Sequence, residues 1–328
     1  MLEFFRKNLF FNALLILPYV AVVRIYSLIY PRPYLLSDEE GYLNHLIFSF
    51  LNDKPLVQSI IAIILIFFQA TFINYIVNKN RIASLPNLLP GIAYVVLVSV
   101  LPSFQMLNPI LISITLLLFA INSLFQCASK FPNAGQIFSV SFFISLASFI
   151  YFPSWVFLLA GYISLVTIRS FKVKERIQYL IGAVVPYYLF SSYFNWYEVL
   201  GKYMSGYLLQ NITLPKLTNG FSAYQIGVVA GFIFLVFFSF FKYNEYRKKK
   251  TVATQKKIDI LYWFLFFTLP MLFFWKNIDL NHFLILVPSL SILFGMFFFS
   301  LKNRFLAETI HGLTIIMIWF TQFQFAGL

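Results

Sequence analysis

The chain of 328 residues is 60% hydrophobic and 21% aromatic, and only 11% of its residues are charged. An ordinary soluble domain carries about 25% charged residues, and a water-soluble fold of this length could not enclose so many Phe and Tyr side chains. A soluble protein is therefore excluded. The single cysteine, Cys127, also excludes an intrachain disulfide and a cysteine-rich metal site.

Apolar stretches long enough to cross a bilayer recur along the whole chain. A helix needs about 20 residues to cross about 30 Å of hydrocarbon. On this rule the sequence predicts an all-α polytopic membrane protein, one integral membrane domain over 1–328, with about 11 transmembrane helices. The predicted spans cover 8–26, 56–76, 82–101, 109–127, 134–152, 154–168, 177–194, 221–241, 258–275, 281–300 and 309–325. A re-entrant hairpin at Phe152-Pro153 would change their number by two but leave both termini on the same sides.

The positive charges give the orientation. Cytoplasmic segments of membrane proteins carry an excess of Lys and Arg. With the N-terminus inside, 18 of the 24 basic residues fall on inner segments, and the C-terminus lies outside. The orientation of the chain in the membrane thus accounts for the net charge of +13. We therefore expect no nucleic-acid partner. The expected location is a cytoplasmic (inner) membrane of the bacterial type, crossed many times.

Three connecting segments are long enough to hold structure. Two are predicted on the outer side, at 28–55 and 195–220, and one basic loop is predicted on the cytoplasmic side, at 242–257. The basic loop contains the tract Arg247-Lys248-Lys249-Lys250, which we interpret as an orientation signal near anionic lipid headgroups.

Carboxylates are concentrated in the first outer loop, where Asp38, Glu39 and Glu40 are consecutive. Ser37 or Asp38 could cap a helix over 36–51, with the acids in its first turn. Its apolar residues recur at helical spacing, which predicts an amphipathic helix along the outer membrane face. These apolar residues are Leu43, Leu46, Ile47, Phe50 and Leu51. The acids are either a solvated helix cap or the carboxylates of an active site.

This loop resembles that of the membrane glycosyltransferases of the C superfamily, which take a sugar from a polyprenyl-phosphate donor. The resemblance rests on one span followed by the pattern Asp38-Glu39-x-x-Tyr42, a surface helix and the turn 51–55. It implies that Asp38, or its rival Glu39, is the catalytic carboxylate, acting as a base toward the acceptor or holding a divalent metal. Tyr42, one turn further along, would shape the same pocket.

A departing phosphate needs cations, and Arg binds phosphate in a bidentate manner. The outer side offers Arg24, Arg32 and Lys276 as candidate phosphate ligands, with His282 in the same polar loop as Lys276. The alternatives are that Arg24 snorkels from the end of the first span and that 276–282 is an ordinary loop.

The predicted function is therefore a glycosyltransferase acting at the outer face of the membrane, with lipid and a polyprenyl-phosphate sugar as partners. The cofactor is left open between none and a divalent metal. A flippase or transporter of a lipid-linked glycan is the first alternative, although the sequence shows no repeat of its spans. A non-catalytic scaffold with membrane-protein partners is the second.

Overall fold

The structure is a computed structural model of the whole chain. It describes residues 2–34, 36, 40–51, 54–128, 134–168, 172–198, 201, 223–248, 250–271 and 280–324. All regular elements in these ranges are helices. The α-helices, in chain order, are α1 (Leu2–Phe5), α2 (Phe10–Leu14), α3 (Ile16–Val23), α4 (Ile25–Ile29), α5 (Tyr42–Ser49), α6 (Pro55–Lys79), α7 (Leu89–Val98), α8 (Pro109–Cys127), α9 (Ala134–Ile150), α10 (Phe157–Ile168), α11 (Val173–Trp196), α14 (Ala223–Phe241), α15 (Tyr243–Arg247), α16 (Val252–Met271), α17 (Val287–Ser300) and α18 (Arg304–Gln324). The 3₁₀ segments are η1 (Pro102–Gln105), η2 (Phe152–Val156) and η5 (Leu280–Leu286).

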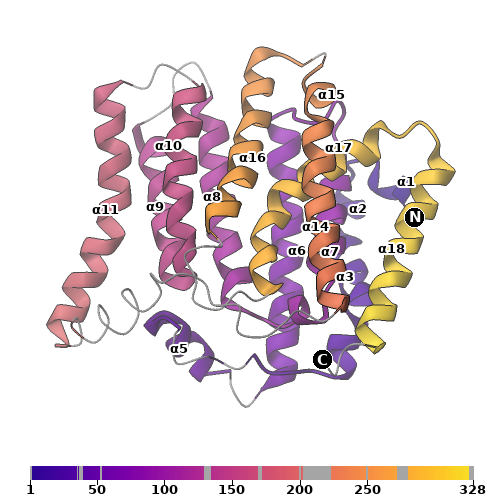
Figure 1. Cartoon of the computed structure of the whole chain (residues 1–328), viewed down its shortest axis with the longest axis horizontal. Helices are drawn as coiled ribbons and strands as arrows, with labels where there is room; N and C mark the ends of the chain where they lie inside the picture. The colour runs from indigo at the N-terminus through magenta and orange to yellow at the C-terminus, as the bar shows by residue number, and fades with distance from the viewer. Residues whose placement is uncertain are drawn as a thin grey trace.

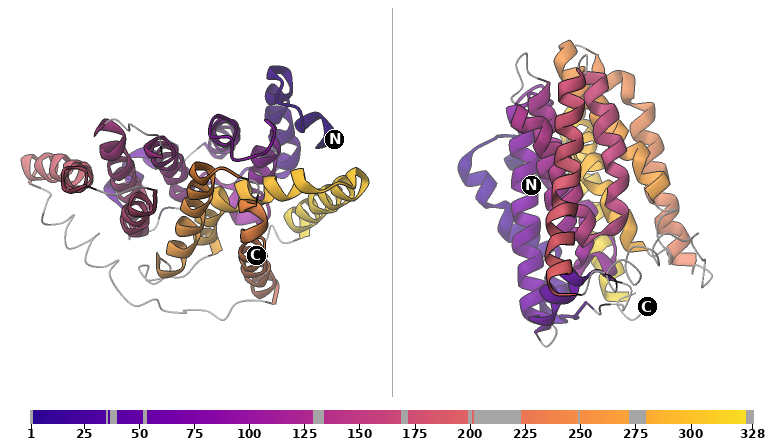
Figure 2. Two further views of the ribbon diagram at one scale, coloured as in Figure 1. Left: turned by 90° about the horizontal axis from the view of Figure 1, so that it is seen from above. Right: turned by 90° about the vertical axis from the view of Figure 1, so that its left-hand side faces the viewer.

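The long helices stand side by side in a bundle that is elongated when viewed from above (Figures 1 and 2). In Figure 1, α11 lies at its left edge and α18 at its right edge, with α6, α7 and α17 between them. Along the bundle, α9 packs against α8 and α11, α10 packs against α16, and α7 packs against α17 and α6.

Within the described residues, three helical stretches are long and apolar enough to cross a membrane, namely Pro55–Lys79, Pro109–Cys127 and Leu280–Ser300. The shorter apolar stretches are Phe10–Val23, Leu89–Val98, Gly135–Ile150, Phe152–Ile168 and Val229–Phe241. The prediction of an all-helical membrane protein is thus confirmed at the level of helices with the length and composition of membrane spans.

Prolines explain why several predicted spans are shorter or broken. The predicted span 8–26 is divided into α2, α3 and α4. Pro18 cannot donate to the carbonyl of Leu14, and its ring crowds that carbonyl, so the helix breaks at Leu15. The predicted span 82–101 is helical only from Leu89, and Pro90 lies in the first turn of α7, where its missing N–H costs no bond within the helix.

Small residues allow α7 to lie close to its neighbours. A Cβ atom at Gly295 of α17 would lie 2.5 Å from the Cα atom of Pro90, and one at Gly91 would lie 2.6 Å from the carbonyl oxygen of Ala70. The backbone N–H of Gly91 instead donates to Asn74 Oδ1 at 2.7 Å. Close helix approach at small residues is a typical means of packing in membranes.

Contacts between connecting segments define one end of the bundle. Lys250 Nζ lies 3.1 Å from Ser84 Oγ, and the N–H of Leu88 donates to the carbonyl of Phe5 at 2.8 Å. Arg6 reaches the carbonyl of Leu301 at 3.3 Å. The N-terminal segment, the turn after α6, the loop after α15 and the end of α17 therefore share the end that carries α15 in Figure 1, and α5 lies at the opposite end.

Candidate functional site at the α5 end

The short helix α5 begins later than predicted, and the residues that it buries differ in part from those predicted. It begins at Tyr42, after Gly41 in an extended conformation, so Glu40 precedes the helix instead of occupying its first turn. Asn44 and Phe48, one turn apart, are buried, with exposed fractions of 2% and 0%. Leu46 and Phe50, predicted on the apolar face, are exposed. Ile47 and Leu51, also predicted on the apolar face, pack against the core, so the buried face overlaps the predicted one and extends to Asn44 and Phe48.

Glu40 is held in a buried hydrogen-bonded position. Its side chain is 9% exposed, and its two carboxylate oxygens accept from Tyr34 Oη at 2.8 Å and from Asn44 Nδ2 at 3.2 Å. The backbone N–H of Tyr34 donates to Gln58 Oε1 at 2.9 Å, which links the same segment to α6. The carboxylate therefore joins the residues before α5, α5 itself and the first turn of α6.

Asn44 connects this cluster to the end of α9. Its Nδ2 atom also donates to the carbonyl of Ile150, the last residue of α9, at 2.8 Å. The next residue, Tyr151, places its hydroxyl 2.6 Å from Nδ1 of His282, and the two rings stack with centroids 5.6 Å apart. The segment after the first span thus contacts the backbone carbonyl of Ile150, and the η5 segment contacts the side chain of the next residue, Tyr151.

We define the junction site as Tyr34, Glu40, Asn44, Tyr151 and His282. It combines a carboxylate, an imidazole and two phenolic hydroxyls, which are groups able to accept, donate and relay protons. His282 is 5% exposed. Sequence reasoning included His282, and it included Glu40 as the third acid of the cluster, but it did not select Tyr34, Asn44 or Tyr151. Asn44, a polar residue one turn from Phe48 on the same helical face, was the signal that could have identified this face.

The other predicted site residues are placed as follows. Tyr42 is the first residue of α5, and Arg32 is exposed in the segment that leads to Tyr34. Asp38, Glu39 and Lys276 lie outside the described residues, so their predicted roles stay predictions.

Arg24 lies at the break between α3 and α4 and is completely buried. Its guanidinium donates to Ser99 Oγ at 3.2 Å and to three backbone carbonyls at distances from 2.7 to 3.1 Å. The three carbonyls belong to Val98, Phe104 and Gln105. Arg24 therefore ties the end of the first span to the turn between α7 and η1. A phosphate contact of this residue stays a prediction, and its four observed partners are all parts of the protein.

An apolar cavity of about 280 Å³ lies away from this site, between α7, α14, α17 and α18. Its walls are almost entirely hydrocarbon, with His311, Thr314 and Thr321 as the polar side chains. His311 Nε2 lies 3.3 Å from the hydroxyl of Tyr19. The volume is at the lower limit of small-molecule pockets, and the lining offers packing more than chemistry.

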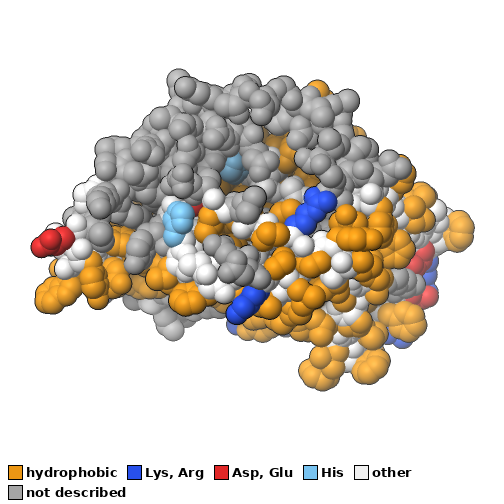
Figure 3. All heavy atoms as spheres, turned by 90° about the horizontal axis from the view of Figure 1, so that it is seen from below, with side chains coloured by type: hydrophobic (Ala, Val, Ile, Leu, Met, Phe, Trp, Pro, Cys, Tyr) orange, Lys and Arg blue, Asp and Glu red, His pale blue; other side chains and the backbone are white. Residues whose placement is uncertain are grey.

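Figure 3 shows the α5 end of the molecule from below, where hydrophobic side chains surround isolated basic and histidine side chains. Among the described residues, no three His, Cys, Asp or Glu side chains form a group that could hold a metal ion. Comparison of the chain with protein-family models, with curated proteins and with solved structures finds no match.

Proposed function

We propose that this protein is a membrane glycosyltransferase that takes its sugar from a polyprenyl-phosphate-linked donor. The observation that carries the proposal is the anchoring of the acidic segment. Glu40, the last of the three consecutive acids, is fixed by Tyr34 and Asn44. Asn44 also bonds the carbonyl of Ile150, and the next residue, Tyr151, bonds His282. A carboxylate segment and an imidazole-bearing segment that contact consecutive residues at one end of a helix bundle suit group transfer at a membrane surface.

The chemistry assigned to the site is a displacement at the anomeric carbon of the sugar. Asp38, with Glu39 as its rival, takes the proton of the acceptor hydroxyl as the acceptor oxygen bonds to the sugar. The bond from the sugar to the phosphate oxygen breaks, and the polyprenyl phosphate leaves with the electron pair. Glu40 acts as a positioning residue, because its oxygens are engaged by Tyr34 and Asn44, and Tyr42 shapes the pocket at the start of α5.

The leaving phosphate requires positive charge and hydrogen-bond donors. Arg32 and Lys276 are the proposed cations, and His282 contributes a ring nitrogen from the junction. Arg24, whose donors go to Ser99 and three carbonyls, supports the proposal by fixing the wall between the first span and α7.

The proposal includes a topology of eleven spans with the N-terminus in the cytoplasm and the C-terminus outside. It is supported by the contact of Lys257 with Asn80, which joins two segments predicted to be cytoplasmic, and by the contact of Lys250 with Ser84 near the predicted inner end of the span 82–101. The α5 end is then the outer face of the cytoplasmic membrane, where the donor headgroup is presented.

The deciding experiment measures sugar transfer from polyprenyl-phosphate donors by the purified chain in detergent or nanodiscs. Asp38→Asn keeps the size of the side chain and removes its charge, so loss of a general base should lower the rate by about 10²–10⁴-fold. Glu39→Gln distinguishes the two rivals, and Asp53→Asn removes a carboxylate from the same loop as a matched control.

A rate loss in Asp38→Asn or Glu39→Gln, with Asp53→Asn close to wild type, would support the assignment. Equal activity of wild type, Asp38→Asn and Glu39→Gln would remove the catalytic carboxylate. No transfer by the wild type with any donor tried would favour a flippase or a scaffold instead.

A further inference from the structure

A second cavity, of about 260 Å³, lies at the end of the bundle opposite α5. It is formed by the turn after α6, by α15 with the loop that follows it, and by the last turns of α17. Its basic residues are Lys248 and Lys250, and Met296 and Phe299 provide an apolar wall. The hydroxyl-bearing residues that line it are Ser84, Tyr246 and Ser300. A basic cavity with one apolar side is suited to an anion that carries hydrocarbon.

The charged residues that line this cavity carry a net positive charge. Glu245 also lines it, but its carboxylate is engaged by Lys242 at 2.6 Å. In the described part of the chain, the contact of the Lys250 ammonium is the Ser84 hydroxyl at 3.1 Å, and no carboxylate lies within ion-pair distance of it. Partial burial lowers the pKa of Lys250. Burial removes part of the hydration of the Lys250 ammonium, and no carboxylate of the described residues replaces it. An anion in the cavity would therefore stabilise the charged form of Lys250.

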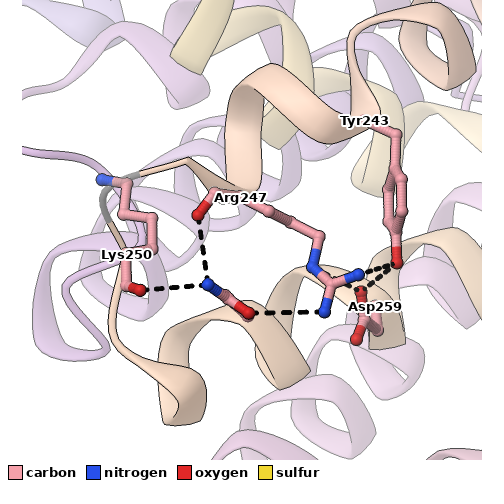
Figure 4. Close-up of polar contacts among 5 residues, drawn as sticks. Tyr243, Arg247, Lys250 and Asp259 are labelled. Atoms are coloured by element: carbon pink, nitrogen blue, oxygen red, sulfur yellow. Dashed lines mark hydrogen bonds and ion pairs between the residues drawn. The ribbon is translucent and has the colours of Figure 1, made fainter.

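Arg247 and Lys250, which lie on either side of Lys248 in the sequence, are held by residues of α16 (Figure 4). Gln255 Nε2 donates to the carbonyls of Arg247 and Lys250, at 3.3 and 3.1 Å. The Arg247 guanidinium reaches the Tyr243 hydroxyl at 2.5 Å, and this hydroxyl donates to Asp259 at 2.8 Å. Arg247 Nε also lies 3.6 Å from Asp259. The backbone carbonyls of Arg247 and Lys250 are thus held before any ligand binds, which reduces the entropy lost on binding.

We propose that this cavity binds the phosphate group of an anionic membrane lipid, with Lys248 and Lys250 pairing with the phosphate oxygens. Ser84 accepts from Lys250 and keeps its own hydroxyl hydrogen for a phosphate oxygen. Met296 and Phe299 contact the upper part of the acyl chains. The site is independent of the proposed glycosyltransferase activity, which uses the other end of the bundle.

The test is native mass spectrometry of the purified full chain, titrated separately with phosphatidylglycerol, phosphatidic acid, phosphatidylcholine and inorganic phosphate. Each basic residue near a lipid phosphate contributes about fivefold to affinity, so Lys248→Gln with Lys250→Gln should weaken binding of the two anionic lipids about 25-fold. The matched control is Lys174→Gln with Lys302→Gln, which removes two exposed lysines outside the cavity. Lys248→Arg with Lys250→Arg keeps both charges and should retain binding.

Equal weakening by the cavity pair and the control pair would overturn the proposal, because the effect would then be general attraction to a basic surface. Loss of lipid binding in the arginine pair would also count against it, since charge would not be the determinant. Binding of inorganic phosphate as tightly as the two anionic lipids would identify a site for free phosphate and overturn the lipid assignment.

Discussion

At the residue scale, Arg24 is the clearest case of a charged side chain whose environment defines its role. Sequence position suggests snorkelling to the membrane surface or contact with a phosphate. In the structure its guanidinium is fully buried and serves Ser99 and three carbonyls around η1. These carbonyls lie where α7 has ended and η1 provides few internal bonds, so Arg24 supplies donors that the backbone lacks.

Replacing Arg24 should destabilise the protein strongly. Arg24→Met removes four hydrogen bonds and leaves buried acceptors unpaired, at a cost of at least about 3 kcal/mol. Arg24→Lys keeps the charge, but an ammonium group cannot make the several directed bonds of a planar guanidinium. Its unfolding midpoint should therefore lie between those of the wild type and Arg24→Met. The measurement is the thermal unfolding midpoint in detergent, with Arg32→Met, an exposed residue, as the control. An Arg24→Met midpoint equal to that of wild type would show that these bonds contribute nothing net.

At the element scale, α5 illustrates how a helix of eight residues is held by its side chains. A helix this short is marginal by itself, because nucleation is costly. Phe48 supplies the buried apolar contact, and Asn44 bonds both Glu40 and the carbonyl of Ile150. Leu46 and Phe50 stay on the exposed side, where they suit contact with the membrane interface.

Removing the Asn44 amide should loosen α5 from the α9–η2 junction. Asn44→Leu keeps an apolar volume but has no donor for Glu40 or Ile150, and unmade buried hydrogen bonds cost about 1–3 kcal/mol. Amide hydrogen exchange over α5 should then accelerate by about 5–150-fold. His45→Ala, on the exposed face of the same helix, should leave exchange close to wild type. Unchanged exchange in Asn44→Leu would mean that Phe48 alone fixes the helix.

At the scale of the whole molecule, polar groups are distributed between two ends of an apolar bundle. One end gathers the basic loop after α14 and the turn after α6, and the other gathers α5, η2 and η5. Between them, buried polar residues bond to one another. Gln69, for example, accepts from Tyr94 at 2.6 Å and donates to Thr115 at 2.8 Å.

The two ends should lie on opposite sides of the membrane. Reporter fusions after Lys250 should give cytoplasmic activity, whereas fusions after Phe50 and at the C-terminus should give activity outside, because inner segments hold the excess of basic residues. A reporter outside at Lys250 or inside at the C-terminus would contradict the topology. A reporter inside at Phe50 would also place the junction site on the wrong face for the proposed donor.

The sequence by itself determined the class of protein, the helical content and the positions of most long helices. Span 109–127 coincides with α8, and 56–76 lies within α6, because hydrocarbon length and composition fix such segments locally. The tertiary structure decided what local pattern cannot encode. The partners of Arg24 lie about 80 residues away in sequence, and Asn44 meets a carbonyl 106 residues distant. The contact between Tyr151 and His282 joins residues 131 apart, so only the packing of the helices could bring that pair together.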